Sequence, residues 1–431
     1  MSRWNWIRIS AAALLCSAAS AGDLRLILAA RDGDKKAVLA LLEQRANVNT
    51  AQPDGATALA WAAHRDEAEI AAILIDAGAN VNAADDNGDT ALLLACGNGN
   101  TNLARMLLEA GAKVGAARWN GETALMAAAS AGNVNLLKLL LDRGAEVNAR
   151  ESRQGQTALM WAAAEGHPEI TRLLIERGAE VKATSNSGFN ALLFAALRGD
   201  APSVGLLLAA GADVNHRRPD GANALLIALG RGHEAAARVL LENRSEVNVR
   251  DGFGSTPLHG AARLGKLDLV RDLLARGADL NARIDKAPPG VPFFRPSNVG
   301  ATPFVTAAEA GQAGLMRELA ERGADARVKT SDGSNALILA AAGGKLEAVK
   351  LLVELGADVN EANNFRRTPL HVAASSGSNE VIAFLVEKGA SLTAKDRRGL
   401  TPLAVAEIQA PKGTIELLRK LTEKLTEKKP D

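Results

Sequence analysis

Aromatic residues are scarce in this 431-residue chain, and their scarcity narrows the classes of partner. Tyrosine is absent and the aromatic types together make up 3% of the residues, which leaves few platforms on which nucleic-acid bases could stack. The formal net charge is only +1, and Lys and Arg are interspersed with Asp and Glu throughout the chain. The sequence therefore indicates no basic groove, and we expect no nucleic-acid partner.

Cysteine is also scarce, because the chain has only Cys16 and Cys96. If a segment containing Cys16 is removed, no disulfide framework is possible, and the fold must rely on its apolar core. Cys96 follows Ala95 in an apolar stretch, which favours a buried packing role over a reactive thiol. Beyond the N-terminal residues, no uninterrupted apolar run is long enough to span a membrane.

Motifs for catalysis or metal binding are missing as well. The chain has no phosphate-binding glycine loop with its Lys-Ser/Thr, no nucleophile elbow and no paired cysteines for zinc. Its six histidines lack the spacing of a local metal or catalytic motif, and they are His64, His167, His216, His233, His259 and His371. We therefore expect no enzyme, no cofactor and no metal, and a structural use for the histidines.

What the chain does contain is a recurring pair of short helices, seen most clearly in residues 251–282. Thr256 can cap a helix by accepting from its free N–H groups, and Pro257 follows at the first helical position, where its missing N–H costs nothing. A second helix is predicted near residues 267–275, where leucines and a valine recur at helical spacing. Gly277 then provides a left-handed stop.

This helix pair recurs in register along the chain. The equivalents of Thr256 are Thr57, Thr90, Thr123, Thr157, Asn190, Asn223, Thr302, Asn335, Thr368 and Thr401. Successive markers are 33 residues apart, except for one spacing of 34 and one of 46. A Gly-Ala pair closes most units, and asparagine in place of threonine still caps a helix. Arg366 replaces the glycine of one turn, and we expect that turn to be distorted.

The motif Thr-Pro-Leu-His at residues 256–259, the two helices and the Gly-Ala stop resemble the ankyrin repeat, a unit of 33 residues. The resemblance implies an all-α solenoid of about twelve helix-turn-helix repeats with finger loops, because a lone helix pair cannot bury its apolar face and a stack can. It also implies that fingers and first helices line one concave side that holds other proteins. In the family, the imidazoles at His259 and His371 tie adjoining turns together.

The predicted organisation has four parts. Residues 1–21 are a signal peptide and 22–51 an N-terminal capping repeat in which Leu24 replaces the threonine. Residues 52–400 are the repeat array, and 401–431 form a C-terminal capping repeat with a polar tail. A polar outer face on the terminal unit is what a solenoid needs to stay soluble.

The first 21 residues have the three regions of a secretory signal. Two arginines lie within residues 1–8, residues 9–19 are mostly apolar, and Ala19-Ser20-Ala21 is a small-x-small cleavage site. Export to the periplasm or out of a bacterial cell is therefore predicted. Lipid attachment at Cys16 and a frayed helix on a cytoplasmic protein are the alternatives.

A proline-rich insertion at residues 283–299 lengthens one link by 13 residues. Its four prolines rule out a regular helix, so an extended and partly stiff loop is expected. Phe293, Phe294 and Arg295 are residue types that are common in binding hot spots. Two alternatives stay open, since these side chains can project toward a partner or fold back over the adjacent helices.

Other candidate contacts follow from their places in the repeat. Aromatic residues at the fingers, where no core is expected, are Trp119, Phe189, Phe253 and Phe365. Three aromatics just after the fourth motif position are assigned to the core, and they are Trp61, Trp161 and Phe194. Charged candidates at the ends of first helices include Arg198, Arg231 and Arg263. Because this set is mainly positive, we expect a protein partner with an acidic patch, bound by a monomer.

Three functions are compatible with these features. The first is a non-catalytic scaffold for protein–protein interaction in the periplasm or outside the cell. The second is a secreted effector that binds a host protein. The third is a small-molecule binder or enzyme that uses the insertion at 283–299, where Asp285 and Lys286 are the only acid–base candidates.

Overall fold

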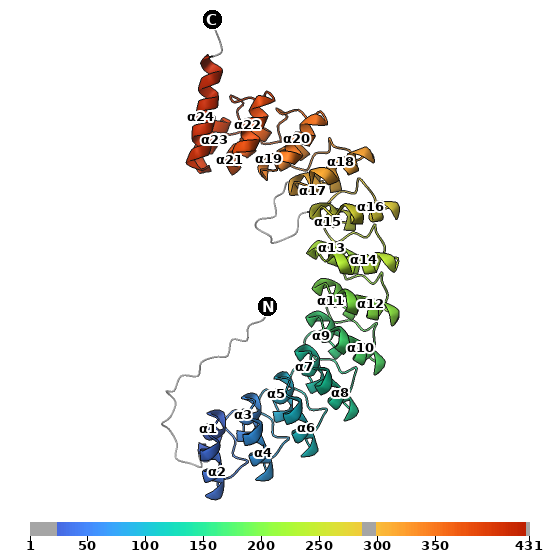
Figure 1. The fold of residues 1–431 in the computed structure, drawn as a ribbon, viewed down its shortest axis with the longest axis vertical. Helices are drawn as coiled ribbons and strands as arrows, with labels where there is room; N and C mark the ends of the chain where they lie inside the picture. The colour runs from blue at the N-terminus through green and yellow to red at the C-terminus, as the bar shows by residue number, and fades with distance from the viewer. Residues whose placement is uncertain (1–23, 287–298, 428–431) are drawn as a thin grey trace. The chain divides into compact units, whose positions relative to one another are not determined.

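The computed structural model describes residues 24–286 and 299–427, and all its regular elements in these ranges are helices (Figure 1). The predicted signal peptide and the trio Phe293, Phe294 and Arg295 lie outside the described residues. The chain divides into two compact units, residues 1–180 and 181–431. In both units helices come in pairs, and we call the odd-numbered helix of each pair the first helix and the even-numbered one the second helix.

Unit 1 contains five helix pairs. Its first helices pack against one another in a row, and each second helix packs on its own partner and on neighbouring second helices. The first helices are α1 (Arg25–Arg31), α3 (Ala58–His64), α5 (Ala91–Gly97), α7 (Ala124–Ala131) and α9 (Ala158–Glu165). The second helices are α2 (Lys35–Glu43), α4 (Ala68–Asp76), α6 (Thr101–Glu109), α8 (Val134–Asp142) and α10 (Pro168–Glu176).

Unit 2 has the same two-layer construction, with seven pairs. Its first helices are α11 (Ala191–Arg198), α13 (Ala224–Arg231), α15 (Pro257–Leu264), α17 (Pro303–Ala310), α19 (Ala336–Ala342), α21 (Pro369–Ser376) and α23 (Pro402–Gln409). Its second helices are α12 (Ala201–Ala209), α14 (Glu234–Glu242), α16 (Leu267–Ala275), α18 (Ala313–Glu321), α20 (Leu346–Glu354), α22 (Asn379–Glu387) and α24 (Lys412–Glu427). The all-α repeat fold is therefore confirmed, including the second helix predicted at residues 267–275.

The first helices begin where the threonine and asparagine markers predict. Thr90 Oγ1 accepts from the backbone N–H of Leu93 at 3.3 Å, and Asn190 Oδ1 accepts from that of Leu193 at 2.9 Å. Each such bond satisfies one of the free N–H groups at a helix start. Leu24, which replaces the marker in the first pair, makes no side-chain cap.

Small residues let neighbouring first helices approach closely. The pair Ala62 and Ala63 in α3 is fully buried, as are Ala95 and Cys96 in α5. Burial raises the pKa of the Cys96 thiol to about 12, so the thiol stays protonated and unreactive. The predicted packing role of Cys96 is confirmed.

A recurring asparagine bridges neighbouring pairs within each unit. In unit 2, Asn248 donates from Nδ2 to the carbonyl of Gly277 at 2.8 Å and accepts at Oδ1 from the N–H of Asp279 at 2.8 Å. Asn82 makes the same two contacts in unit 1, to Gly111 and Lys113. One amide thus satisfies a backbone acceptor and a backbone donor of the next pair.

Four of the described residues other than glycine have left-handed φ angles, and each stands where other repeats have glycine. They are Arg45, Asp66, Arg244 and Arg366, with φ between +58° and +66°. The predicted distortion at Arg366 is wrong, because its N–H donates to the carbonyl of Asn363 at 2.8 Å, as that of Gly254 does to Asp251 at 2.9 Å. The chain keeps the turn and accepts the backbone strain instead.

Within the described ranges, no helix has the length and apolar composition that crossing a bilayer would require.

Candidate protein-binding surface

On most first helices the outward side is formed by the positions four, seven and eight residues after the cap, although position four is buried in α7, α15, α19 and α23. In α11, capped by Asn190, these positions hold Phe194 and Leu197, which are half-buried, and Arg198, which is exposed. The intervening Ala195 and Ala196 are fully buried. This periodicity is that of a helix with one face on a core, and we call the outward residues the first-helix face.

The assignment of Trp61, Trp161 and Phe194 to the core is wrong, because all three are only half-buried members of the first-helix face. The indole N–H of Trp61 donates to Oε1 of Gln52 at 3.2 Å. The indole N–H of Trp161 is buried, yet it has no acceptor among the described residues. Helical spacing explains why the core assignment fails. Position four lies on the same helix face as positions seven and eight, and these face solvent.

The turn before each first helix, which we call the finger, is held rigid by its own hydrogen bonds. In the finger of α15, Oδ1 of Asp251 accepts from the backbone N–H groups of Phe253 and Ser255, both at 2.9 Å. Gly254 supplies the left-handed residue at φ +87°. Neighbouring fingers are joined as well, because the N–H of Asp285 donates to the carbonyl of Phe253 at 2.7 Å.

Trp119 is the most exposed large apolar side chain in the described ranges, with 69% of its surface accessible. Its backbone N–H donates to the carbonyl of Asn87 in the preceding finger at 2.9 Å. The adjacent Arg118 is half-buried and bonds to the buried carboxylates of Asp89 and Glu122, each at 2.7 Å. Trp119 thus stands on a turn that is fixed before binding, which lowers the entropy lost when a partner is bound.

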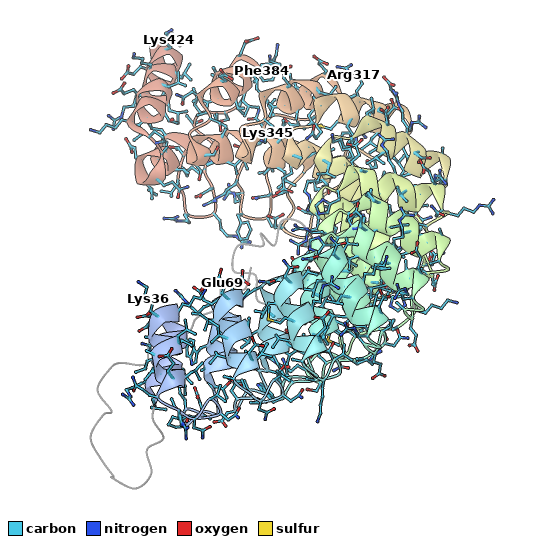
Figure 2. The ribbon with its side chains drawn as sticks, turned by 60° about the horizontal axis from the view of Figure 1, so that its bottom comes forward. Lys36, Glu69, Arg317, Lys345, Phe384 and Lys424 are labelled. Carbon is cyan, nitrogen blue, oxygen red and sulfur yellow. The ribbon has the colours of Figure 1, made fainter. Side chains whose placement is uncertain are left out.

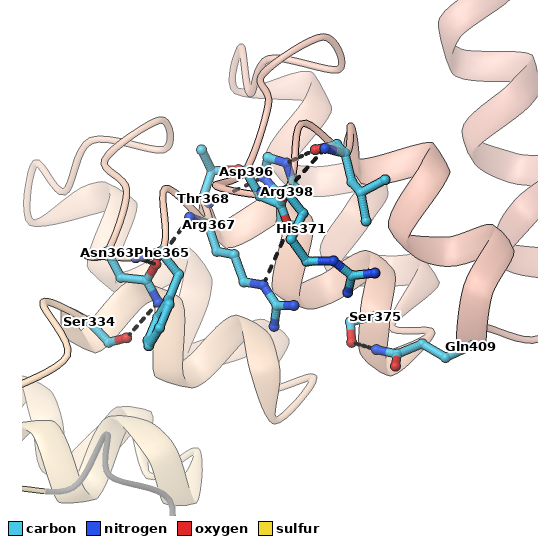
Figure 3. Close-up of polar contacts among 11 residues, drawn as sticks. Ser334, Asn363, Phe365, Arg367, Thr368, His371, Ser375, Asp396, Arg398 and Gln409 are labelled. Atoms are coloured by element: carbon cyan, nitrogen blue, oxygen red, sulfur yellow. Dashed lines mark hydrogen bonds and ion pairs between the residues drawn. The ribbon is translucent and has the colours of Figure 1, made fainter.

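Phe365 is similarly placed in the finger of α21, where 49% of its surface is accessible (Figure 3). Its carbonyl accepts from the N–H of Arg397 in the next finger at 2.9 Å. Oδ1 of Asn363 accepts from the N–H groups of Phe365 and Arg367, both at 3.0 Å. The finger therefore keeps its shape although Arg366 replaces the usual glycine.

The other two finger aromatics are less exposed. Phe189 is half-buried, its ring centroid lies 4.9 Å from that of Phe194, and the guanidinium of Arg218 covers it at 4.6 Å. Phe253 is half-buried and lines a hollow. Trp119 belongs to unit 1, whereas Phe189, Phe253 and Phe365 belong to unit 2.

The hollow beside Phe253 measures about 300 Å³ and lies over Gly260 of α15. Gly260 occupies position four, where α11 has Phe194 and α13 has Ile227. Thr306 of α17 borders the hollow as well. No sequence pattern predicted this hollow.

Charges are distributed differently on the two helix layers. On second helices, ion pairs join neighbours in the same unit, such as Lys35 with Glu69 at 2.8 Å and Arg271 with Glu318 at 2.8 Å. Figure 2 shows Glu69 and Arg317 on this layer. Hydrogen bonds from Arg271 and Arg322 lower the pKa of Glu318 to about 2. These positive charges are therefore largely matched by carboxylates.

The three arginines predicted on first helices have no such partners. Arg198, Arg231 and Arg263 are exposed. Within the described residues, Arg198 and Arg231 form no ion pair, and Arg263 donates only to the carbonyl of Gly230, at 2.9 Å. They stand on consecutive first helices α11, α13 and α15 of unit 2. This row carries positive charge that no ion pair among the described residues neutralises.

Histidines connect neighbouring repeats, as expected. The N–H of Thr256 donates to Nδ1 of His259 at 3.2 Å, so the proton of this imidazole is on Nε2, which donates to the carbonyl of Ala301 at 3.2 Å. His371 bridges to Leu400 in the same way, at 3.0 Å. Burial lowers the pKa of His259 to about 4, although its bond to Ala301 acts in the opposite direction.

A metal centre is not visible in the described part of the chain, where no three His, Cys, Asp or Glu side chains gather as ligands would. The features that do gather are rigid fingers, half-exposed apolar side chains and unmatched arginines. Together they define a helical-repeat protein whose first-helix side offers a surface for another molecule.

Comparison with known proteins identifies the family. The model for three-copy ankyrin repeats matches residues 26–118, 115–185, 192–284, 304–396 and 360–429. The chain therefore belongs to the ankyrin repeat proteins. Ankyrin repeats generally mediate protein–protein interactions, and the fold is typically a non-catalytic scaffold.

One solved structure that matches is the crystal structure of the human ASB11 ankyrin repeat domain. The two sequences are 29% identical, and the match covers 53% of this chain and 96% of that one with a TM-score of 0.45. No curated protein matches.

Proposed function

We propose that this protein is a non-catalytic scaffold, exported to the periplasm or outside the cell, that holds a protein partner on its fingers and first-helix face. The observation that carries the proposal is a contrast between the two helix layers of unit 2. The cations within the second helices α14, α16, α18 and α20 stand in ion pairs, whereas Arg198 and Arg231 on the first-helix face form none with the described residues. Unmatched charge beside half-exposed apolar residues is typical of a binding surface.

Trp119 and Phe365 are the best anchors on these grounds. Both are exposed aromatic residues on hydrogen-bonded fingers, and large aromatic side chains that become buried dominate the energy of many interfaces. Phe253 offers less surface to a partner because its ring is partly covered. Phe189 packs against Phe194 and Arg218 and does not project toward a partner. Phe293, Phe294 and Arg295 stay candidates from the sequence.

Affinity capture from an exported-protein fraction tests this function. The mature chain should retain a partner, and Trp119→Ala or Phe365→Ala should each weaken its capture by about tenfold or more. Leu355→Ala is the matched control, because Leu355 is an exposed apolar residue (46% accessible) at the end of a second helix. Equal capture by all variants would contradict the proposal.

Export is tested separately. Cell fractionation and N-terminal sequencing should find a mature chain that starts at Gly22, after the Ala-Ser-Ala site. A full-length chain in the cytoplasm would contradict this part. Finding the protein in host cells would instead favour the secreted effector. Removal of residues 287–296 tests the third alternative, because loss of small-molecule binding or of an activity with an intact fold would support it.

A further inference from the structure

Three consecutive first helices of unit 2 present a surface whose outward residues change from one helix to the next. The positions four and eight of α11 are Phe194 and Arg198, and those of α13 are Ile227 and Arg231. The next helix, α15, has the hollow over Gly260 in place of an apolar side chain. A ligand that crosses these helices therefore meets an apolar residue with an arginine, the same pair again, and then a recess.

The recess is large enough to take an apolar side chain. Its volume of about 300 Å³ lies at the low end of the range of about 300–1,000 Å³ found for small-molecule pockets. Leu226, Phe253 and Ile284 supply apolar walls, and the guanidinium of Arg263 lies at the α13 side, where it bonds to Gly230. An apolar side chain fits this space, with a carboxylate within reach of Arg263.

The spacing of the helices selects the conformation of the ligand. Packed helices lie about 8–10 Å apart. A polyproline II segment repeats every three residues and rises about 3.1 Å per residue, so its side chains at i, i+3 and i+6 lie about 9 Å apart on one face. In a β-strand, side chains at i and i+3 point to opposite faces. Of these two extended forms, only polyproline II places one side chain at i, i+3 and i+6 on each successive helix.

We infer that the first-helix face of α11, α13 and α15 binds an extended, acidic, proline-containing segment of the partner in the polyproline II conformation. Carboxylates at i and i+3 pair with Arg198 and Arg231, and an apolar side chain at i+6 enters the hollow over Gly260. This inference rests on the proposed function and specifies the chemistry of the partner.

The chemistry of the surface supports this occupant. Arginine pairs with carboxylates through two parallel hydrogen bonds, which fixes geometry as well as charge. Phe194 and Ile227 provide the apolar and aromatic floor against which polyproline II segments dock. A segment that already has this conformation loses little entropy on binding. Glu309 of α17, which also lines the hollow, places a negative charge after the row of Arg198, Arg231 and Arg263.

Fluorescence polarisation with defined peptides and the full chain tests the inference. The probes are fluorescein-labelled Glu-Pro-Pro-Glu-Pro-Pro-Leu and its reverse, Leu-Pro-Pro-Glu-Pro-Pro-Glu, because the direction of the segment is open. The control is Glu-Glu-Pro-Pro-Pro-Pro-Leu, which has the same composition in another register. One of the two probes should bind about tenfold more tightly than the control, and binding should weaken as salt rises.

Substitutions locate the contact. Arg198→Ala and Arg231→Ala should each weaken the probe by about two- to fivefold, the range for an exposed ion pair. Arg317→Ala is the matched control, because this exposed arginine lies on the second helix α18, and it should leave binding unchanged. Circular dichroism of each variant checks that the helices are retained.

The hollow needs a variant that still folds. A Cβ on Gly260 would lie 2.9 Å from Cβ of Leu229, so Gly260→Ala disturbs the packing of α13. Thr306→Phe instead fills the hollow from its half-exposed rim. Replacing the probe leucine by alanine should weaken binding to the unmodified chain about fivefold and have no effect on Thr306→Phe.

Equal affinity for probe and control, or insensitivity to Arg198→Ala and Arg231→Ala, would overturn the inference, as would absence of binding by both probes at about 1 mM. If capture of a natural partner still depends on Trp119 and Phe365 in that case, the proposed function stands and only the acidic segment is refuted. If capture is also insensitive to those residues, both fail.

Discussion

Arg244 provides a direct measure of the backbone strain that this chain carries. It has φ +62° after α14, whereas Gly277 has φ +86° at the equivalent place one repeat later. A Cβ at Gly277 would meet no atom within 4 Å, so only backbone conformation distinguishes the two positions. Arg244→Gly should therefore stabilise the chain, and Gly277→Ala should destabilise it.

The expected magnitude follows from two opposing terms. A left-handed conformation costs an L-residue about 1–2 kcal/mol, and glycine adds about 0.5–1 kcal/mol of unfolded-state entropy. Arg244→Gly should then gain about 0.5–1 kcal/mol, whereas Gly277→Ala should lose a similar amount. Arg244→Ala, which keeps the Cβ, should change little.

Hydrogen–deuterium exchange is the suitable assay, because a repeat array opens in parts and a single unfolding midpoint would dilute a local effect. Amide protection in α14 should rise about two- to fivefold in Arg244→Gly, and protection in α16 should fall by a similar factor in Gly277→Ala. Unchanged or lower protection of α14 in Arg244→Gly would refute the strain argument.

Three further predictions concern stability. Asn248→Ala removes two hydrogen bonds to the next repeat and should lower protection in α16 by about 1–2 kcal/mol; an effect below about 0.3 kcal/mol would contradict the bridging role. Arg118→Ala leaves the buried carboxylates of Asp89 and Glu122 without their cation and should cost about 3 kcal/mol in urea denaturation. A neutral result would show that the triad is dispensable. The pKa of His259 is about 4 in the folded chain and 6.5 in the unfolded chain. Between these two pH values the unfolded state binds more protons than the folded state. The free energy of unfolding should therefore fall by up to about 3 kcal/mol as the pH drops from 6.5 to 4. A His259→Asn variant should lose that part of the pH dependence, and an unchanged slope would disprove it.

Most of the fold could be predicted from the sequence because its signals are local. The cap at Thr256, the proline after it and the stop at Gly277 act within a few residues, and the same signals recur in register. Asparagine at position 190 was expected to cap, and it does. Such short-range chemistry does not depend on how distant parts of the chain pack.

The surface was less predictable because it depends on neighbours. The motif assigns Trp61 and Phe194 to the core because they follow its fourth position, which is usually a buried leucine, whereas counting helical positions from the cap places them beside exposed positions seven and eight. The bridging asparagines also had a signal, since Asn82 and Asn248 recur in register before each finger. The hollow over Gly260 had none, because its walls come from three helices and two fingers.

Hydrogen–deuterium exchange on the captured complex tests the central claim most directly. If partners bind the fingers and the first-helix face, amides of the finger turns around Trp119 and Phe365 and of the C-terminal halves of α11, α13 and α15 should gain protection, while those of α12, α14 and α18 stay unchanged. Protection confined to the second helices would contradict the account.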